Sequence, residues 1–246
     1  MQQKIERETL IHQLCGTHSS SLRRYKIKAA GEISWFKFFR YEMANIFCAQ
    51  LGGGVGFMLR KAAYGPLFEK VGPGLIIGRG VVFRHPGRIS LGRQVAIDDN
   101  VMLDASGAGT EGLRIGNHVI VSRNCIIQGK TGPVALGDRV DIGANTIITS
   151  AGGISIDSSV LIAGNCYIGG SQYYANRQDI PIMDQGLYTR GPIEIGKGSW
   201  LGAGVIVLDG VRIGKMCIVG AGAVVTKDLP DYVVAKGIPA RFTPNT

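Results

Sequence analysis

The stretch IGKGSWLGAGVIVLDGVRIGKMCIVGAGAVVTKD, residues 195–228, repeats itself every six residues. Aliphatic residues open the successive units at Ile195, Leu201, Val207, Ile213, Val219 and Val225. Glycine takes the second place in most units, and the fifth place holds a small residue such as Ser199, Cys217 or Ala223. A helix repeats its apolar residues every 3.6 positions and a strand every two, so a period of six indicates one short unit stacked on itself.

Six residues provide one short strand and one bend. Three such units close a triangular coil of about 18 residues, and coils stack at about 4.8 Å. The opening aliphatic residue and the small fifth residue point into the prism, and glycine in the second place suits the bend. Similar hexads begin at Ile77, so residues 77–228 without their interruption predict an all-β solenoid, a parallel β-helix of about seven coils.

The charge of the chain is concentrated at its N-terminal end. The whole sequence has a formal net charge of +9, and residues 1–72, with 11 Lys or Arg and 5 Asp or Glu, contribute +6 of it. This excess indicates an anionic partner such as a membrane leaflet, with an ordinary solvated surface as the simpler interpretation. The five cysteines form no CxxC pair. We therefore expect no disulfide framework and a reducing, cytoplasmic setting, in which Cys125, Cys166 and Cys217 are buried at fifth places of their hexads.

We divide the chain into a helical, basic region over residues 1–72 and a β-helix domain over 73–242. In the first region we expect a weak helix near 3–14, followed by a mobile link. An aromatic helix within 32–50 and a second helix at 55–63 should come next, because glycines 52–54 separate them.

The aromatic helix has two interpretations, which are compatible with each other. The uncharged run 43–59 is too short and too interrupted to span a bilayer. Residues 23–61 form either a peripheral contact with the membrane interface or a cap on the open end of the β-helix. No signal peptide is visible at the start, so the membrane in question would be reached from the cytoplasm, at its inner face.

A long interruption of the repeats occupies residues 170–192, GSQYYANRQDIPIMDQGLYTRGP. It should protrude as a loop from one corner of the prism. A loop of this length in a compact solenoid is usually functional.

The repeats resemble those of the hexapeptide-repeat acyltransferases over residues 77–242. The most specific part is GPIEIGKGSWLGAGVIVLDGVRIG with VGAGAVVTKDLPDYVVAKGIPARF, which resembles the CoA-dependent sugar and antibiotic O-acetyltransferases. The resemblance implies a left-handed β-helix and a homotrimer. It also implies an acyl-CoA co-substrate, most simply acetyl-CoA, in the groove between neighbouring β-helices.

The resemblance also maps a donor site onto this chain. The mapped residues are Trp200, Gly202 and Ala203 at the thioester end, Ala221 and Gly222 one coil further on, and Lys227 and Arg241 at the nucleotide phosphates. Hexads need glycine for folding in any case. The two cations are the more specific evidence, because the fold does not require them.

The general base of the family has no direct counterpart here. Acyl transfer to a hydroxyl or an amine needs such a base. In the related sugar acetyltransferases it is a histidine of the interrupting loop, whereas this chain reads Gly170-Ser171-Gln172-Tyr173 at that place. The serine-acetyltransferase branch uses the histidine of an LDH motif, which reads Leu103-Asp104-Ala105 here.

The candidate catalytic residues are therefore His118, Tyr173 and Asp184. His118 is fourth in its hexad, where a side chain faces outward and can reach a trimer groove, and Tyr173 can orient an acceptor. Asp184, and also Asp104, could act as a base, and each could equally be a carboxylate that caps a bend.

We expect an O-acetyltransferase that acylates a hydroxyl or amine of a saccharide in polysaccharide biosynthesis. The basic, aromatic N-terminal region indicates a lipid-linked acceptor. The alternative is a catalytically impaired β-helix trimer that serves as a scaffold or binding protein. No metal-spaced cluster and no nucleic-acid motif occur in the sequence, so we expect neither a metal nor nucleic acid.

Overall fold

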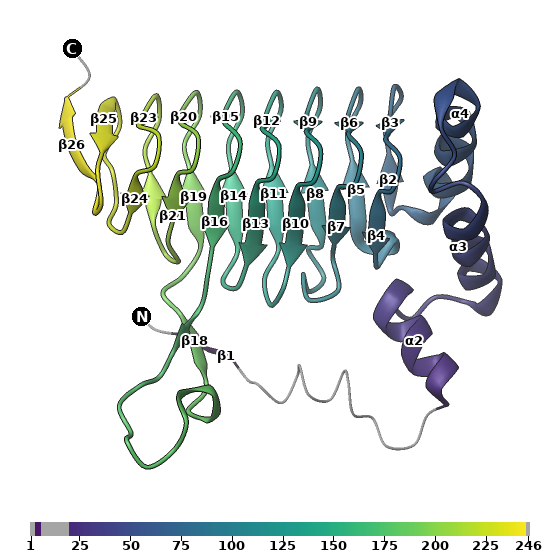
Figure 1. Cartoon of the computed structure of the whole chain (residues 1–246), viewed down its shortest axis with the longest axis horizontal. Coiled ribbons are helices and arrows are strands. Elements are labelled where there is room, and N and C mark those ends of the chain that lie inside the picture. The colour runs from purple at the N-terminus through teal and green to yellow at the C-terminus, as the bar shows by residue number, and fades with distance from the viewer. Residues whose placement is uncertain (1–2, 6–19, 245–246) are drawn as a thin grey trace.

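The computed structural model of the chain describes residues 3–5 and 20–244. Its body is a triangular prism in which the chain winds through three sheets, with helices at one end and a hairpin projecting from one side (Figure 1). We name the sheets faces 1, 2 and 3, in the order in which each coil passes through them, and name each corner by the two faces that it joins.

The strands of each face follow one another along the prism. Face 1 contains β3 (Ile76–Ile77), β6 (Ala96–Ile97), β9 (Ile120–Val121), β12 (Asp141–Ile142), β15 (Leu161–Ile162), β20 (Trp200–Leu201), β23 (Ile218–Val219), β25 (Val233–Lys236) and β26 (Arg241–Pro244). Face 2 contains β4 (Val82–Arg84), β7 (Met102–Asp104), β10 (Ile126–Gly129), β13 (Ile147–Ser150), β16 (Tyr167–Gly169), β21 (Ile206–Val207) and β24 (Val224–Val225). Face 3 contains β2 (Lys70–Val71), β5 (Ile89–Leu91), β8 (Leu113–Ile115), β11 (Val134–Leu136), β14 (Ile154–Ile156), β19 (Ile193–Ile195) and β22 (Arg212–Ile213).

This arrangement confirms the left-handed parallel β-helix of about seven coils. Faces 2 and 3 each have seven strands, and the pairing within them is parallel, as between β7 and β10. Among the described strands of the three faces, only the last pair of face 1, β25 with β26, is antiparallel. The prism begins with β2, three residues before the expected boundary at residue 73.

The first and fifth residues of each hexad point into the prism, as their apolar or small side chains require. The opening residues Ile195, Leu201 and Val207 are buried, and so are the small fifth residues. Ser199 satisfies its hydroxyl inside the prism, where it donates to the Gly214 carbonyl at 2.9 Å. The three cysteines expected to be internal are confirmed as buried, because their sulfurs take the same inward place.

Corner 1/2 is a column of residues in the left-handed conformation. Asn100, Asn124, Asn145 and Asn165 have φ between 59° and 61°, and Gly204 and Gly222 continue the column with φ of 70° and 69°. Asparagine tolerates this conformation better than most residues. The Asn100 amide donates to Asn124 at 3.3 Å and that of Asn124 to Asn145 at 3.1 Å, so side chains link these coils.

The N-terminal helices close the first coil of the prism. They are α2 (Ser21–Ala30), α3 (Trp35–Phe47) and α4 (Gly53–Tyr64), followed by the short helix η1 (Gly65–Leu67). Tyr41 donates to the carbonyl of Phe83 at 2.9 Å, and the buried Tyr64 ring meets Phe83 edge-on at 5.1 Å. The buried guanidinium of Arg60 donates to the Ile77 carbonyl at 2.9 Å. The cap expected for residues 23–61 is therefore part of the fold, and Arg60 belongs to it and not to a basic outer surface.

Two expectations for the N-terminal region were wrong. Residues 3–5, expected in a helix, form strand β1 (Gln3–Ile5), which pairs antiparallel with a strand of the projecting hairpin; the remainder of 6–14 lies outside the described residues. The expected mobile link contains α2, whose N-terminus is capped by the Ser20 hydroxyl accepting from the Arg23 amide at 3.3 Å. Helix α2 is held by tertiary packing, since Ala29 and Ala30 are buried against the prism.

The expected protruding loop over 170–192 is confirmed. It forms a hairpin of β17 (Gln172–Tyr173) and β18 (Leu187–Thr189), with the short helix η3 (Ile182–Asp184) between them. The hairpin leaves the prism at corner 2/3, between β16 and β19, and hangs away from the body (Figure 1). Corner 2/3 also carries the short helix η2 (Pro86–Arg88) and the insertion at 105–112.

Candidate functional site

Corner 1/2 offers a column of uncovered backbone N–H groups. Among the described residues, the N–H groups of Ala203 and Ala221 donate to no acceptor, and both residues are exposed. They are one coil apart, about 4.8 Å along the prism. In the early coils the same place holds the larger side chains of Asp99 and Arg123. The later coils have only small residues there, so a ligand can reach the amides.

The donor residues suggested by the sequence gather around this column. Gly202 packs so tightly under the next coil that a side chain there would lie 2.7 Å from the Ala221 nitrogen. Gly222 has open space around it, and its own N–H donates to the Ala203 carbonyl at 2.8 Å. The Trp200 ring stands on the outside of face 1, where it is 48% exposed. An apolar surface beside two free amide donors can hold an extended chain that contains amide carbonyls.

The two predicted phosphate-binding cations lie near the C-terminal end of the prism on different faces. Lys227 follows β24 of face 2, and Arg241 begins β26 at the edge of face 1. Both are exposed. The Ala240 amide donates to the Val224 carbonyl at 2.8 Å, so the turn before Arg241 is fixed against β24. A polyanion running past this end could meet both cations.

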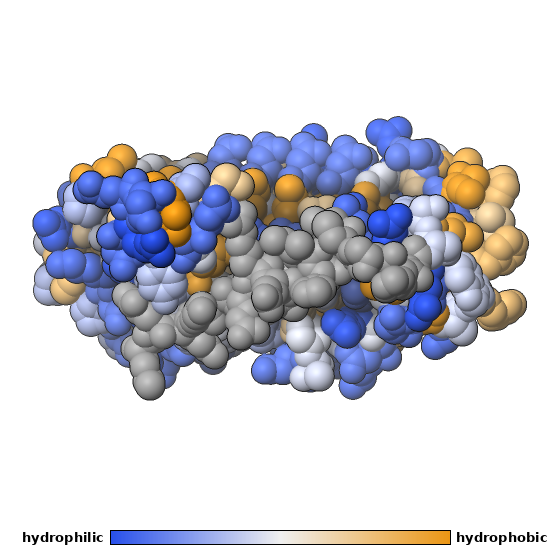
Figure 2. Space-filling model, turned by 90° about the horizontal axis from the view of Figure 1, so that it is seen from below, coloured by the Kyte–Doolittle hydropathy of each residue, from blue (hydrophilic) through white to orange (hydrophobic). Residues whose placement is uncertain are grey.

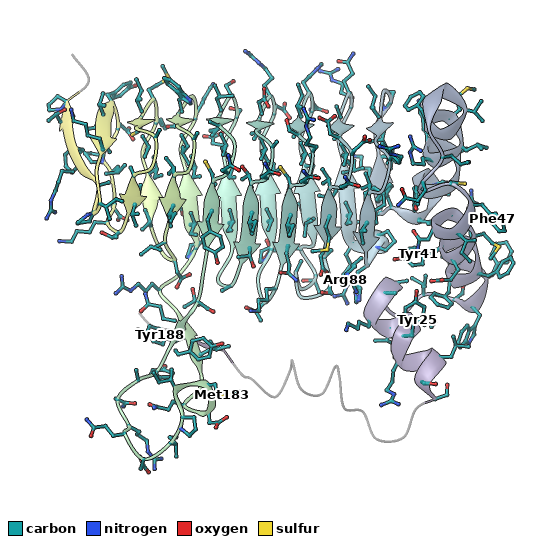
Figure 3. The ribbon with its side chains drawn as sticks, in the orientation of Figure 1. Tyr25, Tyr41, Phe47, Arg88, Met183 and Tyr188 are labelled. Atoms are coloured by element: carbon teal, nitrogen blue, oxygen red, sulfur yellow. The ribbon has the colours of Figure 1, made fainter. Side chains whose placement is uncertain are left out.

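The projecting hairpin carries Tyr173 and Asp184 at corner 2/3. Tyr173 pairs with Leu187 and is 47% exposed, and Asp184 ends η3 on the exposed side of the loop. Inside the hairpin the Tyr188 hydroxyl donates to the Gln172 side chain at 2.6 Å, and the Tyr174 and Tyr188 rings meet at 4.8 Å. Figure 3 shows Tyr188 in the stem and Met183 further out, both away from the prism.

A buried carboxylate anchors the base of the hairpin. Asp209, at the next turn of corner 2/3, accepts from the Thr189 hydroxyl at 2.7 Å and from the Arg190 amide at 2.6 Å. Both Asp209 and Thr189 are nearly inaccessible to solvent. Sequence reasoning missed this residue, because an aspartate before a glycine in a repeat is typical of an ordinary bend.

His118 does not join the hairpin within one chain. It occupies corner 3/1 with φ of 57° and an exposed ring, whereas Tyr173 and Asp184 lie at corner 2/3. Along face 1 its coil is three strands before that of Trp200, or about 14 Å. The three corners of one prism therefore carry three separate parts of the predicted site.

The carboxylate of Asp104 acts as a bend cap. It accepts from the Ser106 amide at 2.9 Å and from the Gln128 side chain at 3.1 Å, and it is buried. Within the described part of the chain, no group of three or more His, Cys, Asp or Glu residues is placed to hold a metal ion. Over the same residues, no helix is long and apolar enough to cross a bilayer.

Comparison with known proteins places these coils in a family. The family described as "Bacterial transferase hexapeptide (six repeats)" matches residues 192–227, and "Hexapeptide repeat of succinyl-transferase" matches 112–150 and 133–169. The first of these ranges contains both Ala203 and Ala221.

Two curated relatives are acetyltransferases by name. "Probable acetyltransferase Rv3034c" of Mycobacterium tuberculosis is 35% identical over 170 residues, which are 69% of this chain and 52% of the relative. Galactoside O-acetyltransferase of Lactococcus lactis is 36% identical over 123 residues, or 48% of this chain and 59% of the relative. The chain thus spans about half the length of the curated relatives that it matches.

Solved structures share the fold. AntD, an N-acyltransferase from Bacillus cereus, was solved as a single-residue variant with dTDP-4-amino-4,6-dideoxyglucose and coenzyme A. It is 25% identical with a TM-score of 0.51, over 72% of this chain and 83% of that one. A second AntD complex, with dTDP and coenzyme A, has a TM-score of 0.52 at 24% identity over 72% and 84% of the two chains. The repeats and the β-helix place the chain among the hexapeptide-repeat proteins, and its sequence is similar to acetyltransferases of that class.

Proposed function

We propose that this protein transfers an acyl group, most simply acetyl, from acyl-CoA to a hydroxyl or amine of a saccharide. The observation that carries the proposal is the pair of free amides at Ala203 and Ala221, one coil apart beside Trp200. The pantetheine arm of CoA has two amide groups, whose carbonyls need donors of this kind. Lys227 and Arg241, further along the prism, would then bind the phosphates.

A homotrimer would bring the separated corners together. Face 1 carries a stripe of exposed apolar side chains beside the amide column, at Ile76, Ile120, Leu161 and Trp200. Such a stripe supports packing against a neighbouring prism. In a trimer of parallel prisms, the hairpin of one copy can approach the amide column of the next, which a single chain does not permit.

His118, Tyr173 and Asp184 are the candidates for the general base and for orienting the acceptor. His118 carries an imidazole, the commonest general base in enzymes, but it needs a neighbouring copy to approach the acceptor. Tyr173 would orient the acceptor from the hairpin, and the Asp184 carboxylate is the alternative base. Substituting each residue separately and measuring kcat at saturating acetyl-CoA distinguishes them, because only the base should lower kcat by about a hundredfold or more.

Peripheral contact with a membrane is supported by the outer surface of the cap. Phe36, Val55 and Met58 are 77%, 71% and 69% exposed on α3 and α4. Apolar side chains gather at this end of the molecule in Figure 2. Residues 23–61 contain eight basic and two acidic residues, and six of the basic residues are exposed, since Lys26 and Arg60 are buried. An apolar surface within a cationic segment suits an anionic leaflet, which would bring a lipid-linked acceptor to the protein at the inner face.

Vesicle flotation tests the membrane contact. We expect Phe36→Glu with Met58→Glu to abolish binding to phosphatidylglycerol vesicles. The matched control is Ile238→Glu, which changes a residue that is 76% exposed at the opposite end of the chain. Equal flotation of all variants would overturn the membrane proposal and leave the acyl transfer untouched.

The activity itself is tested by thiol release from acetyl-CoA with a panel of free and lipid-linked saccharides. Release that depends on the acceptor supports the proposal. Binding of CoA without turnover on any acceptor supports the alternative, a β-helix that serves as a scaffold or binding protein. The alternative has one observation in its favour, since the loop place of the family's histidine holds Ser171 and Gln172, and the Gln172 side chain is already engaged by Tyr188.

A further inference from the structure

A cavity lies far from the amide column, between α2 and corner 2/3. Its volume is about 540 Å³, and its walls come from α2, η2 and the ends of β7 and β10. Arg88 is seen at this place in Figure 3, between the prism and α2. A volume of this size suits a small polar ligand.

The wall on the prism side is a column of three polar side chains. Arg84, Asp104 and Gln128 are partners in register on β4, β7 and β10. They extend outward from neighbouring strands, about 4.8 Å apart. Asp104 is nevertheless buried, because α2 and the insertion after β7 cover it. A buried carboxylate beside an amide is a common arrangement for binding hydroxyl groups.

Among the described residues, the cations of the cavity form no ion pair with an anionic side chain. Within residues 20–244, neither Arg84 nor Arg88 forms an ion pair or a side-chain hydrogen bond, although Asp104 is the register neighbour of Arg84. Lys28 of α2 adds a third positive charge, and Glu32 and Asp104 supply two negative ones. Unpaired guanidinium groups at a cavity wall suit a phosphate, which they can bind through two parallel hydrogen bonds.

His85 leaves one more polar atom unsatisfied beside the cavity. Its backbone is in the left-handed region with φ of 50°, and its Nδ1 is buried without a hydrogen-bond partner. Gly31, at the end of α2, lies against this atom, since a Cβ there would be 3.0 Å from it. Burial and the nearby Arg88 lower the pKa of His85, so the ring is neutral near pH 7. Orphaned buried polar atoms are rare and are often satisfied by a ligand.

We propose that this cavity binds a phosphorylated saccharide, with Arg84 and Arg88 at the phosphate and Asp104, Gln128 and Ser106 at the sugar hydroxyls. This assignment rests on the proposed function, because the bound part would be the end of the saccharide acceptor that is joined through phosphate to its carrier. The carrier phosphate can belong to a nucleotide or to a polyprenyl lipid, and both present the same group to the two arginines. The cavity is four strands of face 2 from the coil of Trp200, about 19 Å, so it is distinct from the donor site.

Calorimetric titration of the full chain with glucose 1-phosphate, UDP-glucose and CoA tests the proposal. We expect Arg84→Ala with Arg88→Ala to weaken binding of the sugar phosphate at least about tenfold and to leave CoA binding unchanged. The matched control is Arg114→Ala, which removes an exposed cation from face 3 and should change neither affinity. Thermal melting checks that the variants fold.

The Asp104→Asn variant distinguishes the contribution of the sugar contacts from that of the phosphate contacts. It should weaken glucose 1-phosphate and leave the affinity for inorganic phosphate unchanged. Flotation with phosphatidylcholine vesicles is measured with and without a polyprenyl phosphate. A lipid carrier is identified if the polyprenyl phosphate increases flotation of the wild type and does not increase that of the double variant. Binding of UDP-glucose identifies a nucleotide carrier. The proposal is overturned if no phosphorylated probe binds, if the double variant binds like the wild type, or if it loses CoA instead. Intact CoA binding with no sugar-phosphate binding would refute the cavity assignment alone, and the proposed acyl transfer would stand.

Discussion

Replacing Ala203 and Ala221 with proline tests the amide column with little disturbance of the fold. Proline removes the N–H group, and neither N–H takes part in a hydrogen bond among the described residues. Each alanine has negative φ and precedes a glycine with φ near 70°. Proline is favoured at this place in such a turn, so the free energy of unfolding should change by less than about 1 kcal/mol.

The expected loss of CoA affinity follows from the number of hydrogen bonds removed. One neutral hydrogen bond contributes about 0.5–1.5 kcal/mol, so each single variant should raise Kd by about 2- to 13-fold. The double variant should raise it by about 5- to 150-fold if the two contributions add.

Isothermal titration with CoA measures these changes, and urea unfolding checks stability. The matched control is Ala144→Pro, which places proline in the same turn two coils before Ala203 and should leave Kd unchanged. A double variant that folds normally and binds CoA like the wild type would refute the reasoning. An equal loss in the control would show that the effect does not belong to the later coils.

Three further predictions concern the fold around the sites. Asp209→Ala removes two hydrogen bonds to a buried carboxylate and should destabilise the docked hairpin by about 2–4 kcal/mol. Hydrogen exchange over residues 172–189 should then become faster, whereas the exposed Asp228→Ala should leave it unchanged. Equal exchange in both variants would contradict the role of Asp209 as an anchor. Gly222→Asn should change the free energy of unfolding by less than about 1 kcal/mol, since asparagine fills this column in earlier coils. Gly202→Ala should lower it by about 1–3 kcal/mol, because the added methyl group overpacks against the next coil. Urea unfolding midpoints compare the two variants, and a larger loss for Gly222→Asn would be evidence against this packing. The pKa of His85 is lowered in the fold, so its contribution to the free energy of unfolding is fully present above the unfolded pKa of about 6.5 and is lost as the pH falls toward the folded pKa. His85→Gln should therefore flatten the pH dependence of stability below about pH 6.5. An unchanged pH profile of the urea midpoint would exclude this role.

The repeat period was enough to predict the prism, because each hexad place has a steric role that the residue type reveals. The opening aliphatic place, as at Leu201, and the small fifth place, as at Cys217, both face inward, and the structure buries both. The hairpin over 170–192 was predictable for the same reason, as a gap in the period. Helix α2 was not, because its residues are mostly polar and its packing against α3 and the prism cannot be read from its own sequence.

The sites were predictable only in part. Trp200, Ala203 and Ala221 could be named by resemblance, but which amides remain unpaired depends on the hydrogen bonds between coils. The cavity under α2 was hidden for a different reason. Asp104 and Gln128 are 24 residues apart, whereas Arg84 and Asp104 are 20 apart, so variable insertions at corner 2/3 conceal their shared register.

The structure of the protein with acetyl-CoA bound tests the central claim most directly. We predict that the pantetheine arm lies along corner 1/2 and accepts hydrogen bonds from Ala203 and Ala221, with the phosphates near Lys227 and Arg241. Acetyl-CoA bound away from these later coils, or absent from crystals soaked at saturating concentration, would contradict the assignment of the donor site.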